Sequence, residues 1–244
     1  MAHGDGEFTM KFICPAFDRM SAEMLALSRL YAFPRKPEPP AVDGLVLLDS
    51  GAYGLAQHGA AIGLRHMARL AEHYQPHAVQ AGYRCIAPDV YLNPGQTMGN
   101  WCWWHEQYDL SVAPVIQFPK ARRLDLWSVR KQAQFYARWA PAFVAVSNPG
   151  LRALEAREMP IVCRMVREIT GATWLHNLGA GWDPDDLARW RDLGCFDSVD
   201  SVAYYTDARD GWQWAHGGRA FSDAPWREIA AANAAVAVQI AEGV

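Results

Sequence analysis

The sequence predicts an α/β protein built as a compact (β/α)8 barrel, and three observations support this prediction. Short apolar runs alternate with helix-length segments along most of the 244 residues. The runs are almost continuously apolar, as is typical of parallel strands that are covered on both faces. The chain length is close to that of one such barrel, and no GxGxxG motif follows an early run to suggest a dinucleotide-binding sheet. We therefore expect one domain spanning residues 1–244.

The expected strands and helices follow each other in a regular order. A strand at 11–17 is followed by a proline-rich loop at 33–44, which leads into the first clearly apolar run. The further expected strands are 45–53, 84–92, 113–118, 143–148, 173–181 and 196–205. The expected helices are 56–74, 121–139, 151–169, 184–193 and 224–241. The helix at 184–193 has the clearest signals, with Asp183 as its cap, Pro184 at its first position and Gly194 after its last.

Composition and charge restrict the functions that the chain can have. Apolar residues make up 51% of it, enough for a large core, and the net charge of −3 gives no overall basic field for nucleic acid. A nucleic-acid partner therefore requires a local basic patch. No apolar run approaches the ~20 residues of a membrane span, and the N-terminus lacks the basic-then-apolar pattern of a signal peptide. We expect a cytoplasmic protein with no membrane partner.

The cysteines predict neither a disulfide framework nor a metal site. The chain has five, an odd number, at widely separated positions: Cys14, Cys85, Cys102, Cys163 and Cys195. No CxxC or CxC motif occurs, and His105-Glu106 has neither HExxH nor HxxEH spacing. We expect reduced, mostly buried thiols, and no metal or other cofactor.

Polar or small residues stand where several of the expected strands end. They are Asp49-Ser50-Gly51, Asp89, Gln117, Asn148, Gly179-Ala180-Gly181 and Asp200. The carboxyl ends of barrel strands meet at one mouth, where active sites lie, so we expect these residues to converge. Simpler interpretations exist for each: Asp49 or Asp89 as a helix cap, Gln117 as a hydrogen-bonding loop residue, and the glycines as a turn. Their shared position at strand ends favours a functional site.

Five segments resemble one enzyme family, in the family's order. HNLGAGWDPDDLARWRDLGCFDSVDSVAYYTDARDG (176–211) resembles the corresponding stretch of archaeal tRNA-guanine transglycosylases. Shorter motifs of the same superfamily are similar to LLDSGAYG (47–54), IAPDVYLNPGQT (86–97), PVIQF (114–118) and VAVSNPG (144–150). The match at 176–211 is specific, whereas the others are short. The resemblance implies a (β/α)8 barrel that exchanges a base on a nucleoside.

The resemblance also implies a role for each strand-end residue. Asp200 corresponds to the nucleophile that attacks C1′ of a guanosine, and Asp49 to the general acid and base. Substitution with retention at an anomeric carbon requires such a nucleophile and a separate proton carrier. The motif favours Asp200 over the nearby Asp197 as the nucleophile. The residues implied to contact the base are Ser50, Gly51, Asp89, Gln117, Asn148, Gly150, Leu178 and Gly179.

Departures from the family indicate which acceptor is modified. Nothing after Cys195 supplies the cysteine zinc site of the tRNA enzymes, and SNPG (147–150) replaces their GGL. The chain looks most like the short, zinc-free members from phages and DNA-modification islands, which insert 7-deazaguanines such as 7-cyano-7-deazaguanine into DNA. We therefore expect DNA and a 7-deazaguanine base as partners, with accessory modification proteins as further candidates. The alternatives are tRNA or a free nucleoside as acceptor, hydrolysis of a nucleoside, and an inactive barrel that binds nucleic acid.

Candidate nucleic-acid contacts follow two of the strand-end residues, Gln117 and Asp200. They are Lys120, Arg122, Arg123, Arg130, Lys131 and Arg209. Cations suit phosphate contacts, and a solvated helix face is the simpler alternative. NWCWWHEQYD (100–109) is expected to be a stacking surface for a flipped base or, more simply, an aromatic cluster at the mouth or an interface. DGWQWAHGG (210–218) is expected to be a flexible lid or substrate loop.

Overall fold

The computed structural model confirms the predicted α/β barrel. It describes residues 10–16, 20, 24, 27–37, 39, 44–60, 62–119, 124–147, 158–179, 184–215 and 218–243. Within these ranges, eight parallel strands form one sheet in the order β4-β3-β2-β1-β8-β7-β6-β5. Their bounds are β1 Lys11–Pro15, β2 Arg29–Ala32, β3 Val46–Asp49, β4 Tyr83–Cys85, β5 Val115–Ile116, β6 Phe143–Ser147, β7 Trp174–Leu178 and β8 Ser198–Asp200.

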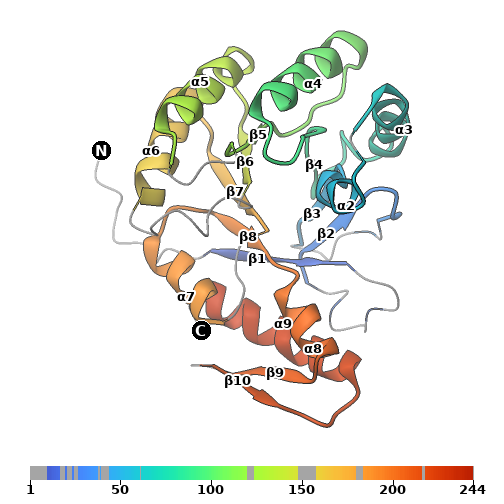
Figure 1. Cartoon of the computed structure of the whole chain (residues 1–244), viewed down its shortest axis with the longest axis vertical. Coiled ribbons are helices and arrows are strands. Elements are labelled where there is room, and N and C mark those ends of the chain that lie inside the picture. Colours follow the sequence, from blue (N-terminus) through green and yellow to red (C-terminus); the bar gives the residue numbers. More distant parts are fainter. Residues whose placement is uncertain are drawn as a thin grey trace.

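The two edge strands of this sheet, β4 and β5, meet at one isolated bridge. Ile86 and Ala113 pair there in parallel. The Ala87 N–H donates to the Ala113 carbonyl at 2.8 Å, and the Ala113 N–H donates to the Cys85 carbonyl at 2.7 Å. These contacts join the two edges of the curled sheet, which lies between the surrounding helices (Figure 1). The seam is far shorter than the ladder between β6 and β7, where five residue pairs are in register.

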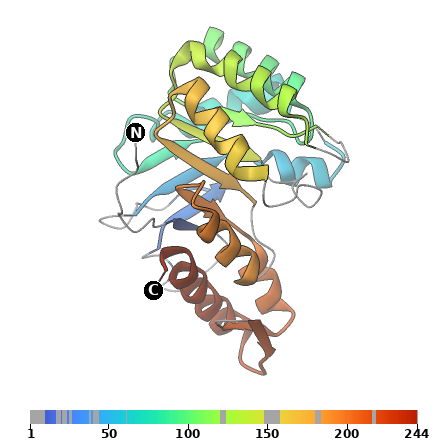
Figure 2. The same ribbon diagram turned by 90° about the vertical axis from the view of Figure 1, so that its left-hand side faces the viewer.

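Helices lie around the outside of the curled sheet (Figures 1 and 2). Their bounds are α2 Ala52–Gln57, α3 Leu64–Tyr74, α4 Pro94–Gln107, α5 Leu126–Tyr136, the 3-10 helix η1 Ala137–Trp139, α6 Met159–Thr170, α7 Pro184–Leu193, α8 Ala203–Arg209 and α9 Trp226–Glu242. The last helix returns to the first strand, because the Met10 N–H donates to the Ala241 carbonyl at 3.2 Å. Among the described helices, none has the length and apolarity that crossing a bilayer requires.

Strand side chains alternate between the inside of the ring and the helix layer. Leu47 and Val115 belong to a buried cluster that, in the described part of the chain, contains no helix residue. Val46, Leu48 and Ile116 instead belong to the large cluster that includes the buried faces of the helices. Because successive strand residues face opposite sides, a residue two positions after an inner residue also faces inward. This alternation decides which polar residues enter the barrel.

The helix predicted at 56–74 is instead divided into α2 and α3, and the strand β2 and the helix α4 were not predicted from the sequence. β2 is a four-residue strand that begins with the buried Arg29, an unusual residue for a central strand. α4 contains glycine, asparagine and several aromatic residues, which are weak helix formers. It begins at a recognisable signal, since the Asn93 side chain accepts from the Gln96 N–H at 3.0 Å and Pro94 takes the first position. Burial of Trp101 and Trp104 then holds the helix against the core.

The predicted strand at 196–205 is wrong in its second half. The strand β8 ends at Asp200, and the helix α8 begins at Ala203. The Ser201 hydroxyl accepts from the Ala203 N–H at 3.1 Å and so helps the chain to turn between the two elements. Asp200 is therefore a strand-end residue at the mouth, as the barrel prediction requires.

The segment expected to be a flexible lid is instead part of a β-hairpin. Strands β9 (Trp212–Ala215) and β10 (Gly218–Phe221) pair in antiparallel fashion between α8 and α9. Figures 1 and 2 show this hairpin beside α8 and α9, on the side of the molecule opposite α4 and α5. Gly211 precedes it with a φ of +83°, a conformation that favours glycine, and a Cβ there would lie 2.6 Å from the Phe221 ring.

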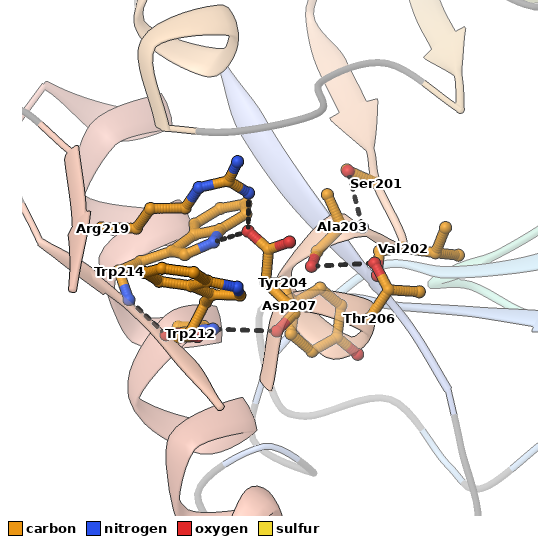
Figure 3. Close-up of polar contacts among 10 residues, drawn as sticks. Ser201, Val202, Ala203, Tyr204, Thr206, Asp207, Trp212, Trp214 and Arg219 are labelled. Atoms are coloured by element: carbon orange, nitrogen blue, oxygen red, sulfur yellow. Dashed lines mark hydrogen bonds and ion pairs between the residues drawn. The ribbon is translucent and has the colours of Figure 1, made fainter. Parts of the chain in front are cut away.

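Two polar side chains hold the hairpin against the helices. Asp207 accepts from the Trp214 indole at 2.8 Å and from Arg219 Nη1 at 2.9 Å (Figure 3). Asn233 Oδ1 accepts from the Trp214 N–H at 2.6 Å, and Asn233 Nδ2 donates to the carbonyls of Tyr204 and Trp212. An isolated two-stranded hairpin is marginally stable in water, so these contacts explain why this one is ordered.

Candidate active site at the mouth of the barrel

The predicted strand-end residues converge inside the barrel. Asp49 and Gln117 each lie two positions after an inner core residue, Leu47 and Val115. Asp200 lies one residue after Val199, which belongs to the outer cluster, so it also faces inward. All three stand at the carboxyl ends of parallel strands and therefore at the same mouth.

Asp200 is buried and held through one of its two oxygens. Its Oδ1 lies 3.0 Å from His176 Nε2 and accepts from the Gly179 N–H at 3.0 Å. No described residue is bonded to Oδ2. The carboxyl group is thus fixed in orientation and keeps one oxygen available for bond formation.

Asp49 lies close to two other carboxyl groups. Its Oδ2 accepts from the Gly51 N–H at 3.0 Å, which closes a local turn at the end of β3. Burial, followed by the negative charges of Asp89 and Asp200, raises the pKa of Asp49 to about 7. A carboxyl group with such a pKa can give or take a proton near neutral pH, which is the property expected of a general acid and base.

Asp89 forms the centre of a buried network at the mouth. The Ser50 hydroxyl donates to its Oδ1 at 2.7 Å, and Gln117 Nε2 donates to its Oδ2 at 2.5 Å. Burial raises the pKa of Asp89. The opposite atom of the same amide, Gln117 Oε1, is buried and has no hydrogen-bond partner among the described residues. The network therefore presents one acceptor without a donor, as a site that awaits a ligand does.

The simpler interpretations of the two aspartates as helix caps are wrong. α2 begins at Gly51 without a side-chain cap, and α4 is capped by Asn93. Asp49 and Asp89 instead point into the barrel and interact with each other electrostatically. Gln117 follows the end of β5 and donates to Asp89 in the loop between β4 and α4, which agrees with the simpler interpretation of a hydrogen-bonding loop residue.

Several residues that support the site were not identified from the sequence. Gln132 of α5 bonds both backbone groups of Gln117, at 2.8 Å each. Tyr74 of α3 donates to the carbonyls of Leu48 and Ile86, which fixes the ends of β3 and β4. His176, which contacts Asp200, is the first residue of the HNLGAG motif and was given no role. The motif was the signal that could have identified His176, whereas nothing in the sequence pairs the two helix residues with their strands.

Asp197 lies at the opposite end of β8 and is paired with a cation. Its Oδ2 accepts from Arg167 Nη2 at 2.6 Å and from the Leu175 N–H at 2.5 Å. It follows that Asp197 is outside the mouth. The geometry favours Asp200 as the reactive carboxylate, in agreement with the motif.

Of the remaining predicted contact residues, some lie in the described part of the chain and others lie outside it. Leu178 packs against the inner cluster, and Gly51 and Gly179 contribute backbone N–H groups to Asp49 and Asp200. Arg209 is exposed on α8, with its guanidinium 5.8 Å from the centre of the Tyr205 ring. The residues that lie outside the described part of the chain are Asn148, Gly150, Lys120, Arg122 and Arg123.

The outer face of α5 combines cations with an exposed aromatic ring. Arg130 and Lys131 are exposed, and the helix contains no acidic residue. Trp127 is 65% exposed, and Lys131 Nζ lies 4.1 Å from the centre of its ring. Gln132 of the same helix is bonded to Gln117, so the buried side of α5 packs beside the end of β5 while Trp127, Arg130 and Lys131 face outward. Exposed aromatic and cationic side chains are the groups that hold single-stranded nucleic acid.

The tryptophans of residues 100–109 have a structural role in this fold. Trp101 and Trp104 are buried, and they contact Tyr136 and Tyr74 at ring-centre distances of 5.2 and 5.8 Å. They join α4 to its neighbouring helices. These two residues therefore form an aromatic cluster, but it lies in the helix layer and not at the mouth.

No metal centre is found in the described part of the chain, where no three His, Cys, Asp or Glu side chains are grouped as ligands. The cysteines are free thiols, and all except the partly exposed Cys102 are buried. No protein-family profile matches the sequence, and a search of curated proteins finds no match. The geometry of the mouth is therefore the basis for assigning its chemistry.

Proposed function

We propose that this protein is a transglycosylase that replaces guanine in DNA with a 7-deazaguanine through a covalent bond to Asp200. The observation that carries the proposal is the pair of inward-facing carboxyl groups at the mouth. Among the described residues, donors reach only one oxygen of Asp200, and the pKa of Asp49 is raised to about 7. A nucleophile and a separate proton carrier are the two groups that base exchange needs.

In the first half-reaction, Asp200 Oδ2 attacks C1′ of the target nucleotide. A C1′–O bond forms, the C1′–N9 bond breaks, and the electron pair of that bond stays with the base. Protonated Asp49 gives its proton to the base, which leaves as neutral guanine. The raised pKa keeps part of the Asp49 population protonated at neutral pH, as this step requires.

In the second half-reaction, a 7-deazaguanine takes the place of guanine. Asp49 is now a carboxylate and accepts the N9 proton of the incoming base. N9 then attacks C1′, the C1′–O bond to Asp200 breaks, and its electrons return to the Asp200 carboxylate. Two successive inversions retain the configuration at C1′, and Asp49 regains its initial protonation state.

The Ser50–Asp89–Gln117 network suits recognition of a guanine-type base. Such a base presents N–H donors on its Watson–Crick edge beside the O6 acceptor. Gln117 Oε1 is buried and lacks a donor, so an N–H of the base would remove an unsatisfied acceptor. Ser50 and Gln117 hold the Asp89 carboxyl in place for the same edge.

A polynucleotide acceptor is supported by the exposed face of α5. Arg130, Lys131 and Trp127 lie on a helix without acidic residues, whose buried Gln132 is bonded to Gln117. A free nucleoside needs no such surface. The choice of DNA over tRNA rests on the resemblance to the short, zinc-free members of the superfamily.

The test is a base-exchange assay with three acceptors. The purified protein is incubated with labelled guanine or 7-cyano-7-deazaguanine and with double-stranded DNA, single-stranded DNA or bulk tRNA. We expect label in DNA, no label with Asp200→Asn, and a covalent protein–DNA adduct that mass spectrometry places on Asp200.

Each other outcome corrects a different part of the proposal. Label in tRNA would retain the chemistry and overturn the acceptor. Release of guanine without incorporation would indicate hydrolysis of the intermediate by water. Binding of DNA with neither exchange nor adduct would identify an inactive nucleic-acid-binding barrel and overturn the proposed reaction.

A further inference from the structure

We infer that Trp174, Ser198 and His176 form a hydrogen-bonded relay that positions Asp200 and fixes which of its oxygens reacts. The inference rests on the proposed function, because it assigns Asp200 a nucleophilic role. The three residues are positioning residues, since none of them is proposed to touch the reacting carbon.

The relay runs across two neighbouring strands inside the barrel. The Trp174 indole N–H donates to Ser198 Oγ at 2.7 Å, and Ser198 Oγ lies 2.8 Å from His176 Nδ1. His176 Nε2 lies 3.0 Å from Asp200 Oδ1. The register of the sheet creates this order, because His176 of β7 pairs directly with Ser198 of β8.

The direction of each hydrogen bond follows from the donors available. An indole N–H can only donate, so Ser198 Oγ accepts from Trp174. Ser198 Oγ is buried and has no further hydrogen-bond partner among the described residues, so its single proton has His176 Nδ1 as its acceptor. A neutral imidazole that accepts at Nδ1 carries its proton on Nε2. His176 therefore donates to Asp200, and the relay selects this tautomer.

Aromatic packing keeps the imidazole ring in the plane that the relay needs. The Phe143 ring is stacked on His176 with centres 6.1 Å apart and on Trp174 with centres 6.3 Å apart. His176 and Ser198 are both fully buried. No water therefore competes for these hydrogen bonds from the solvent side, and the ring cannot turn without leaving the stack.

The relay has a direct consequence for the Asp200 carboxylate. Its Oδ1 receives two donors, His176 Nε2 and the Gly179 N–H, while Oδ2 receives none from the described residues. Oδ2 is thus the oxygen that forms the bond to C1′. When that bond breaks again, the two donors are already in place to stabilise the returning negative charge on the carboxylate.

Three variants test the relay through activity. We expect Ser198→Ala to slow formation of the covalent adduct by on the order of 10- to 100-fold, because the other histidine tautomer would turn a lone pair toward Asp200. His176→Gln, whose amide N–H can replace Nε2–H, should retain most of the activity that His176→Phe loses. The KM for the free base should change little in each case.

The double variant separates a relay from a purely structural role. Glutamine has no tautomer to select, so Ser198→Ala should change the rate of adduct formation little when it is added to His176→Gln. Equal losses in both backgrounds would overturn the relay. Trp174→Phe is a milder probe of the same contact if a histidine variant fails to fold.

A measurement on the resting protein tests the relay independently of the reaction. Nitrogen-15 NMR of histidine-labelled protein distinguishes the two neutral tautomers, and the signal lost in His176→Gln identifies the residue. An Nε2–H tautomer that becomes mixed in Ser198→Ala supports the relay even if no base exchange is found. An Nδ1–H tautomer in the native protein would overturn it, whatever the activity.

Discussion

The two ends of strand β8 carry aspartates three residues apart in opposite surroundings. Asp197 is paired with a cation, Arg167, at 2.6 Å. Asp200 is held by a ring nitrogen and a peptide N–H, and it stands near Asp49. A carboxylate whose charge is neutralised by an arginine stabilises a fold. Asp200 receives the same number of hydrogen bonds but lies near another carboxyl group, and it is the carboxylate that we propose to react.

The same contrast extends to the whole barrel. At the mouth, three carboxyl groups share a buried space, and burial raises the pKa of Asp49 and Asp89. Around the base of β8, the charge of Asp197 is balanced by Arg167. The mouth is thus the region where stability is given up for chemistry, which is common at functional sites.

The largest expected effect comes from exchanging one aspartate at each end of β8. Asp200→Asn should lower base exchange by at least about 10³-fold, because a nucleophile is removed. Asp197→Asn should leave exchange nearly unchanged and lower the free energy of unfolding by about 1 kcal/mol, because it breaks a partly exposed ion pair. Single-turnover exchange and urea unfolding check both. If Asp197→Asn loses most of the exchange activity and Asp200→Asn does not, the assignment of Asp200 as nucleophile and Asp197 as a structural residue is wrong.

The second effect concerns the proton carrier at the mouth. Asp49→Asn should lower the rate of adduct formation by on the order of 10²-fold, since general acid catalysis is lost. In the native protein, this rate should fall as the pH rises through about 7, because protonated Asp49 is consumed. The variant should lack that limb of the pH profile. If the rate of adduct formation in Asp49→Asn still falls as the pH rises through about 7, a group other than Asp49 is responsible for that fall.

The third effect is on the free energy of unfolding. Asp197→Asn should lower it, whereas Asp49→Asn at the mouth should raise it above neutral pH. The pKa of Asp49 is about 7 in the folded protein and near 4 in an unfolded chain. The folded state therefore holds a proton that the unfolded state releases, and stability falls as the pH rises between these values. Asp49→Asn should be more stable than the native protein at pH 8, by about 2 kcal/mol, and no more stable at pH 4. Urea unfolding at several pH values measures this difference.

The smallest effect is expected outside the mouth, on α5. Trp127→Ala and Lys131→Ala should each weaken binding of single-stranded DNA by about 3- to 10-fold. Only Lys131→Ala should also reduce the salt dependence of binding, because only it removes a cation. Arg189→Ala on α7 is the matched control, since it removes an exposed arginine from another helix. Equal losses in the control would show that net charge alone governs binding.

The sequence predicted the mouth better than the groups that support it. Asp49, Asp89, Gln117 and Asp200 could be predicted because each ends or follows an apolar run, a pattern that is local in the chain. His176 and Gln132 were not assigned roles, because their contacts depend on strand register and on helix packing between distant segments. The strand β2 and the helix α4 were missed for a related reason, since tertiary burial overrides their weak local preferences.

The seam between β4 and β5 makes the ring of strands mechanically uneven. One bridge closes the barrel there, and the hydrogen bond between Asp89 and Gln117 spans the same gap just above it. The hydrogen bond between Asp89 and Gln117 therefore reinforces the strand pair that has the shortest ladder in the described sheet. A base that forms hydrogen bonds with Asp89 and Gln117 would weaken or replace the hydrogen bond between them. Binding of a base at the mouth and the closure of the barrel between β4 and β5 therefore depend on the same side chains.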